Sequence, residues 1–290
     1  AGSAVAAMAD SMLWIIAGRA LQGAGAISAA VTALIADTTR EEQRTKAMAM
    51  VGASIGLSFA ASLVLSPVLY RVIGMPGIFA LTGLLALVAI VVVLRVVPPA
   101  PALPGTRVGF RKILLDAELM RLNYGVFALH LMQMAMFVVM PSALIRFVQL
   151  PLEQHWKIYL PVVLASFALM LPPLLAAERR GKSKQIFLCA IVLLLLVQLG
   201  MWYLLQQVHP GWLMPLGLLL AFFVAFNILE ASQPSLVSRI APPSSKGAAL
   251  GVYNTLQSLG LFCGGAVGGL LAQQVGPSSI FIMGAALCVG

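Results

Sequence analysis

Three ionisable side chains stand inside long apolar stretches of the sequence. Arg19 lies in the run 12–36, His130 lies in the run 122–145, and Glu230 interrupts the apolar stretch that begins at 210. A charge in the apolar part of a membrane helix costs on the order of 2.5–3.5 kcal/mol on insertion scales, so such residues usually face a bundle interior and serve a function. Because a carboxyl and an imidazole can both carry protons, the pattern predicts a site that exchanges protons.

Each of these residues also has a structural interpretation. Arg19 can extend its side chain to the outer surface of the membrane. Glu230 can make a structural hydrogen bond to a neighbouring helix, and His130 can be a neutral donor between helices. The sequence leaves both interpretations open for all three residues.

The segment GAGAIS, which contains Gly23 and Gly25, is close to the dinucleotide-binding pattern GxGxxG. No strand precedes it, and no acidic residue follows in a βαβ context, so close helix packing explains the two glycines better. No HExxH, GxSxG or aspartate pair lies inside an apolar run, which argues against an enzyme. The three cysteines all lie in apolar runs and are interpreted as packing residues. We therefore expect no cofactor and no metal site.

Composition places the chain in a membrane. Of its 290 residues, 61% are hydrophobic and 9% are charged, whereas about a quarter of a soluble domain is charged. Runs free of acidic and basic residues are near the roughly 17–25 residues that cross a bilayer as a helix. Together with the run 12–36, which only Arg19 interrupts, they predict eight complete spans, and shorter pieces lie at 1–9 and from 279 onward. The charge-free runs are 47–70, 72–94, 122–145, 158–177, 185–208, 210–229 and 247–275.

The basic residues separate onto alternate connections between the spans. Most of the 18 lysines and arginines lie in four segments, 37–46, 95–121, 178–184 and 239–246. By the positive-inside rule these segments are cytoplasmic. The formal net charge of +9 therefore reports orientation, and we expect no nucleic-acid partner.

One cytoplasmic connection differs from the others. Residues 98–118 are rich in proline and then become basic and amphipathic, a composition that suits a linker ending in a short helix at the membrane surface. The linker divides the chain into an N-terminal bundle, 1–97, and a C-terminal bundle, 119–290.

The two parts share a repeat of small residues at an offset of about 200. The run 251–269 spaces its small residues much as 53–67 does, and RTKAMAM (44–50) aligns with SSKGAAL (244–250). Extending this offset predicts about twelve helices in the complete protein, two six-helix halves related by a pseudo-twofold axis. On this scheme the chain starts at the end of the third helix and stops at the start of the twelfth.

Three motifs carry a family resemblance. RALQGAGA from Arg19 resembles the RxxxGxG motif in the fourth helix of major facilitator transporters. The glycine-rich segment 251–269 resembles the antiporter motif, here in the eleventh helix, and AERRGKSK (177–184) resembles the second copy of the D-R-x-G-R-K motif. From end to end the chain is similar to the YajR-type branch of the 12-helix bacterial drug/proton antiporters.

The resemblance implies an all-α membrane protein with the major facilitator fold, truncated here at both ends. It implies a monomeric multi-pass transporter of the bacterial inner membrane that exports small amphipathic molecules against protons by alternating access. The fifth helix keeps only Ser66 and Pro67 of the G-P-x-x-G-G ending typical of antiporters, so a proton symporter or importer stays open. A channel or a non-transporting sensor fits the two-half repeat less well.

The site residues follow from both lines of reasoning. We expect Glu230, helped by Arg19 or His130, to couple protons. The remaining expectations fall into three groups. Polar residues that line the substrate cavity are Gln22, Gln133, Asn227, Gln233, Tyr253, Asn254 and Gln257. The expected gating residues are Asp37, Glu178, Arg179, Arg180 and Lys182. The alternative interpretation is a basic cytoplasmic loop whose charges only set the orientation in the membrane. Residues for close helix packing are Gly23, Gly25, Pro67, Gly260, Gly264 and Gly268.

Overall fold

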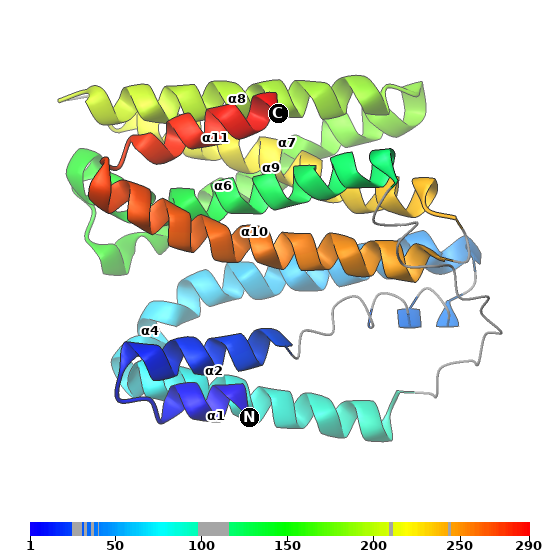
Figure 1. Ribbon diagram of the computed structural model, residues 1–290, viewed down its shortest axis with the longest axis horizontal. Helices are drawn as coiled ribbons and strands as arrows, with labels where there is room; N and C mark the ends of the chain where they lie inside the picture. Colours follow the sequence, from blue (N-terminus) through cyan, green and yellow to red (C-terminus); the bar gives the residue numbers. More distant parts are fainter. Residues whose placement is uncertain are drawn as a thin grey trace. The chain divides into compact units, whose positions relative to one another are not determined.

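The computed structural model describes residues 1–24, 31, 34–35, 38–39, 41–97, 116–208, 211–242 and 245–290, and at 24, 41–49, 51–53 and 177–180 it describes the backbone alone. Every regular element in these ranges is helical (Figure 1). The chain divides into two compact units, Ala1–Pro104 and Gly105–Gly290. The boundary falls within 98–118, the segment expected to be a linker.

The first unit contains α1 (Gly2–Ala7), α2 (Met12–Ala24) and α4 (Glu41–Arg95). The short helix α1 packs against both α2 and α4. Its contact with α2 depends on small residues, because a Cβ added to Gly18 would lie only 2.7 Å from the backbone nitrogen of Ala6. Close approach of helices through such residues is common in membrane proteins.

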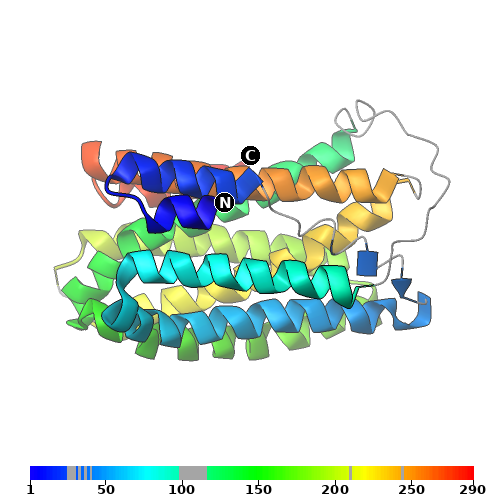
Figure 2. The ribbon, with the colours of Figure 1, turned by 90° about the horizontal axis from the view of Figure 1, so that it is seen from below.

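Helix α4 contains two of the expected spans and reverses between them. Its one non-helical residue is Gly74, with φ 63° and ψ −177°, a backbone conformation that is essentially restricted to glycine. Figures 1 and 2 show from two directions that the arms of α4 on either side of this turn run in opposite directions. The reversal lies within 71–77, where the charge pattern places a connection.

The second unit is a bundle of longer helices. They are α6 (Ala117–Val148), η1 (Leu152–Gln154), α7 (Trp156–Arg180), α8 (Ser183–Gln206), α9 (Leu213–Ile240), α10 (Lys246–Gln274) and α11 (Ser279–Val289). Asp116 caps α6 by accepting hydrogen bonds from the backbone N–H groups of Glu118 and Leu119, both at 3.0 Å. Such a cap satisfies amides that have no partner inside the helix.

The helices of this unit alternate in direction. In Figure 1, α6, α8 and α10 run one way, and α7, α9 and α11 run back. Arg121, Lys182 and Arg239 therefore lie at one end of the bundle, whereas Arg146 and Lys157 lie at the other. The alternation expected from the charges is thus present in space, and the positive-inside rule assigns the first end to the cytoplasm.

Six described helical segments are long and apolar enough to cross a membrane. They are Ser54–Arg95, Ala117–Val148, Leu152–Ala176, Ser183–Gln206, Leu213–Ile240 and Lys246–Gln274. The first is the part of α4 that holds the reversal at Gly74, so it covers two of the expected spans. The remaining expected span, 12–36, begins with α2, which has 13 described residues. Most of the other residues of this span lie outside the described ranges.

Glycines allow α6 and α10 to approach each other closely. Gly260 and Gly264 lie against backbone carbonyl oxygens of α6, and a Cβ at Gly268 would lie 2.9 Å from the Cβ of Ala135. These three glycines are buried on α10. We call this contact the glycine seam.

The other residues expected to pack helices behave differently. No described atom lies within 4 Å of a Cβ built on Gly23, so the close approach expected there is absent from the described structure, and Gly18, one turn earlier, makes it instead. Gly25 lies outside the described residues. Pro67 is half-buried within α4 and does not interrupt the helix.

Candidate functional site

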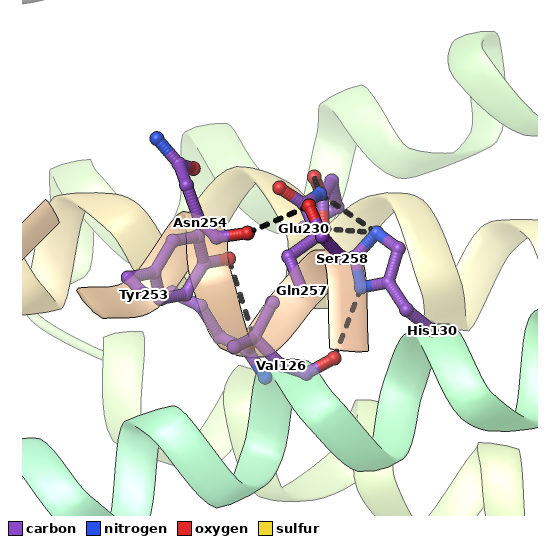
Figure 3. A network of polar contacts seen from close by, with 8 residues as sticks. Val126, His130, Glu230, Tyr253, Asn254, Gln257 and Ser258 are labelled. Atoms are coloured by element: carbon purple, nitrogen blue, oxygen red, sulfur yellow. Dashed lines mark hydrogen bonds and ion pairs between the residues drawn. The ribbon is translucent and has the colours of Figure 1, made fainter. Parts of the chain in front are cut away.

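Three helices of the second unit bring together the acid and the histidine that the sequence singles out. His130 on α6, Glu230 on α9 and Gln257 on α10 form one hydrogen-bonded group (Figure 3). The Gln257 Nε2 atom lies 2.8 Å from His130 Nε2 and 3.0 Å from Glu230 Oε1. Residues 127 positions apart in sequence therefore share one polar site inside an apolar bundle.

The contacts of His130 define where its proton lies. Its Nδ1 atom is 3.0 Å from the carbonyl oxygen of Val126, one turn earlier on α6. A carbonyl oxygen can only accept, so Nδ1 carries the hydrogen and donates it. Nε2 is then free to accept a hydrogen bond from Gln257. The imidazole is 4% exposed, and Phe226 packs edge-on against it with ring centroids 5.4 Å apart.

Glu230 is less enclosed than its partner, with 35% of its side chain exposed. Its two oxygens differ, because Oε1 accepts from Gln257 whereas Oε2 is buried without a hydrogen bond from any described residue. Oε2 lies 3.5 Å from His130 Nε2, which is within ion-pair range if the ring is protonated but too long for a strong hydrogen bond. The site can therefore hold a proton on the carboxyl or on the ring.

Further polar residues of α9 bind neighbouring helices. Gln233 is 2% exposed, and the hydroxyl of Tyr253 donates to its Oε1 at 3.4 Å. Asn227 donates through Nδ2 to the Ser166 hydroxyl on α7 at 2.9 Å, and that hydroxyl donates in turn to the carbonyl oxygen of Val163 at 2.7 Å. These residues were expected to line a cavity, but in this structure they hydrogen-bond to protein groups.

Two expected cavity residues have a looser environment. Gln133 on α6 and Asn254 on α10 are half-buried. The side chain of neither makes a hydrogen bond to another described residue. Ser166, in contrast, was not predicted from the sequence, because a single serine in an apolar run has no signal beyond its hydroxyl group.

The polar residues of the first unit form their own chain of contacts. Arg19 Nη1 donates to Gln22 Oε1 at 2.6 Å, and Gln22 Nε2 donates to the Ser3 hydroxyl at 2.5 Å. The Arg19 side chain is exposed, and it pairs with no carboxylate among the described residues. Arg19 and Glu230 belong to different units, so the structure describes each site separately.

The expected gating residues lie mostly outside what is described. Asp37 is outside the described residues, and at Glu178, Arg179 and Arg180 only the helical backbone of α7 is described. Lys182 is exposed just before α8 begins. The structure therefore gives the place of the motif in the turn between α7 and α8.

The sequence matches the family described as the Major Facilitator Superfamily over residues 1–262 and 163–290. These two overlapping matches cover the whole chain. The chain therefore belongs to the Major Facilitator Superfamily.

Individual relatives carry the comparison further. The chain is 40% identical, over 99% of its length, to the inner membrane transport protein YajR of Escherichia coli strain K12, and it spans 63% of the length of that protein. It is 30% identical, over 97% of its length and 72% of the relative's, to an uncharacterized transporter of Buchnera aphidicola subsp. Schizaphis graminum. One similar solved structure is a bacterial homologue of the human lysosomal transporter Spinster, in an inward-facing and unoccupied conformation. It covers 99% of this chain and 77% of its own, with a TM-score of 0.59 and 15% identity, which indicates a shared fold.

Proposed function

We propose that this chain is the larger part of a secondary active transporter that exports small amphipathic molecules in exchange for protons. Its place is the bacterial inner membrane, as the name of the 40% identical relative suggests. Two helical bundles, 1–97 and 119–290, expose a binding site to one side of the membrane and then to the other. The partners are the substrate, protons and the lipid bilayer, and the working unit is a monomer.

The observation that carries the proposal is the buried group of Glu230, His130 and Gln257. A carboxyl within a membrane bundle is costly and marks a proton or substrate pathway. Here it lies 3.5 Å from an imidazole and accepts a hydrogen bond from an amide. A purely structural acid would have both oxygens paired, yet no residue in the described part of the chain hydrogen-bonds to Oε2 of Glu230. That oxygen is available to a proton.

The side chain of Glu230 is more exposed than that of His130. Part of it is exposed, whereas His130 beside it is almost fully buried. A carboxyl in this position can exchange a proton with a wet cavity and hold it while the bundles move. Arg19 in the first unit is the second candidate for coupling, and its role rests on the family resemblance.

Symport or import is the second candidate function. It is favoured by the fifth-helix segment of α4, where Ser66 and Pro67 stand in place of a G-P-x-x-G-G ending. The two functions move the substrate in opposite directions relative to the proton. The direction of proton movement on addition of substrate therefore separates them.

Everted membrane vesicles with a preset pH gradient provide the test. We expect members of a panel of small amphipathic fluorophores to dissipate the gradient in vesicles that contain the intact protein. We expect Glu230→Gln to remove this effect, because an amide cannot carry the proton. Ser258→Ala, an exposed position on α10, is the matched control and keeps wild-type behaviour.

Two outcomes would contradict the proposal. Fluorophores that change the gradient in the opposite sense would support symport and exclude export. Wild-type dissipation by Glu230→Gln would remove Glu230 from the proton pathway.

A further inference from the structure

We propose that Gln257 positions the transported proton by holding His130 as a neutral acceptor, which leaves Glu230 as the group that takes the proton up. The inference rests on the proposed function, since it specifies how the same site binds its proton. It also gives Gln257, which was expected to contact substrate, a different role.

The first step is the identity of the atom between the acid and the ring. One atom, Gln257 Nε2, lies within hydrogen-bond distance of both His130 Nε2 and Glu230 Oε1. An amide NH₂ group has two hydrogens and can donate both. Each partner must then offer a lone pair. His130 already donates its Nδ1 hydrogen to Val126, so the ring has one hydrogen and is neutral.

The opposite orientation of the Gln257 amide would require an additional proton on each of its two partners. If the oxygen of Gln257 occupied the central position, both partners would have to donate to it. His130 would then be a full imidazolium, and Glu230 would have to be protonated on Oε1 at the same time. The orientation with nitrogen at the centre needs neither proton and satisfies both contacts.

The second step concerns the acceptor that remains. In this arrangement His130 Nε2 and Glu230 Oε1 each receive a hydrogen from Gln257, whereas Glu230 Oε2 receives none from the residues that the structure describes. A buried carboxylate oxygen without a donor is costly. One proton added to the carboxylate gives a carboxylic acid, removes the buried charge and breaks no existing bond. The exposed part of the side chain gives that proton a route.

The surroundings contain little else that titrates. Among the described residues, the titratable side chains that act electrostatically on Glu230, or on which it acts, are His130 on α6 and Tyr253 on α10. From α7, the neighbouring polar group is the hydroxyl of Ser166, which is bound to Asn227. The choice of proton acceptor therefore lies between the ring and the carboxyl, and Gln257 decides it.

Replacing the amide should reverse that choice. In Gln257→Met the side chain keeps a similar length but donates no hydrogen bond. His130 Nε2 then loses its donor, and the nearest charged atom is Glu230 Oε2 at 3.5 Å. We expect the ring to take up a proton and form a direct ion pair with the carboxylate.

Two spectroscopic measurements on the intact protein in lipid test this without any substrate. Nitrogen NMR of ¹⁵N-histidine-labelled protein, with His130→Asn for assignment, should show one protonated and one bare ring nitrogen in His130 near neutral pH. Infrared spectra should show a carboxylic acid band that titrates with pH and is absent from Glu230→Gln. In Gln257→Met, both ring nitrogens of His130 should be protonated near neutral pH, because the ring no longer accepts a hydrogen bond from the amide. Gln257→Leu checks the result in a second side chain, and Ser258→Ala should match the wild type.

The outcomes separate this inference from the proposed function. A His130 ring that keeps one bare nitrogen near neutral pH in both Gln257 variants would overturn the role of Gln257 and leave Glu230 as the proton carrier. A wild-type His130 ring with both nitrogens protonated at neutral pH would overturn the inference in the same way. If no band is lost in Glu230→Gln, the acid does not take up the proton, and the proposed function fails first.

Discussion

The polar residues of the second unit form two kinds of pair, which differ in how completely their polar atoms are hydrogen-bonded. Asn227 and Ser166 form a closed pair, since the serine hydroxyl has both a donor and an acceptor partner. Glu230 and His130 form an open pair, since one carboxylate oxygen has no hydrogen-bond partner within the described ranges. Closed pairs stabilise helix contacts, and open ones can change their protonation without breaking the fold.

The closed pair should contribute measurably to stability. Hydrogen bonds between membrane helices contribute about 0.6 kcal/mol on average and up to about 1.7 kcal/mol. A double-mutant cycle of Ser166→Ala and Asn227→Ala, followed by reversible unfolding in mixed micelles, should give a coupling energy in this range. A coupling energy indistinguishable from zero would show that the 2.9 Å contact does not stabilise the bundle.

At the scale of residues, the sequence singles out unusual side chains but does not give their contacts. Glu230 and His130 were found because ionisable groups are rare in apolar runs. Gln257 was placed in the substrate cavity, because a glutamine near the start of a glycine-rich helix gives no indication of its partner. Its partners depend on the register of three helices, and no local pattern in the sequence fixes that register.

At the level of elements, the glycine seam fixes how α6 and α10 meet. The backbone carbonyl of Leu131 occupies the space that a side chain at Gly264 would need. Since His130 and Gln257 belong to these two helices, the seam also fixes the distance between them. The packing and the group of Glu230, His130 and Gln257 therefore depend on the same contact.

Enlarging one glycine of the seam should separate the two helices. We expect Gly264→Val to destabilise the protein by about 1–3 kcal/mol, the usual cost of overpacking. Gly269→Val is the control, because nothing lies within 4 Å of a Cβ at Gly269. Thermal unfolding in detergent compares the two variants. Equal stability would mean that α10 can shift without cost and that the seam does not position the site.

The sequence predicted the elements well and their ends less well. Charge-free runs located each long helix of the second unit. The run 210–229 stopped at Glu230, however, whereas α9 continues to Ile240. A buried acid interrupts a hydrophobic run but not the backbone hydrogen bonding of the helix. Counting only charge-free residues therefore ends the predicted helix too early, at Glu230.

For the whole molecule, the distribution of charge gives the orientation in the membrane. The turn between α7 and α8 should face the cytoplasm, and η1 should face the opposite side. In a background without native cysteines, Lys182→Cys should react with an impermeant thiol reagent only from the cytoplasmic side, and Glu153→Cys only from the outer side. Both positions are exposed. Labelling of both from the same side would contradict the topology.

The repeat and the motifs predicted the family, which the comparisons confirm. The substrate and the direction of coupling could not be predicted in the same way. Similar helices can serve export or import, because the fold fixes alternating access and not its direction.

The central claim is that a proton on Glu230 drives net transport. Proteoliposomes that contain the intact protein allow gradient-driven accumulation of a transported fluorophore to be compared with exchange of the same fluorophore at equilibrium, where no net proton movement is needed. We predict that Glu230→Gln retains exchange and loses accumulation driven by a pH gradient. Accumulation at the wild-type rate in Glu230→Gln would contradict the claim.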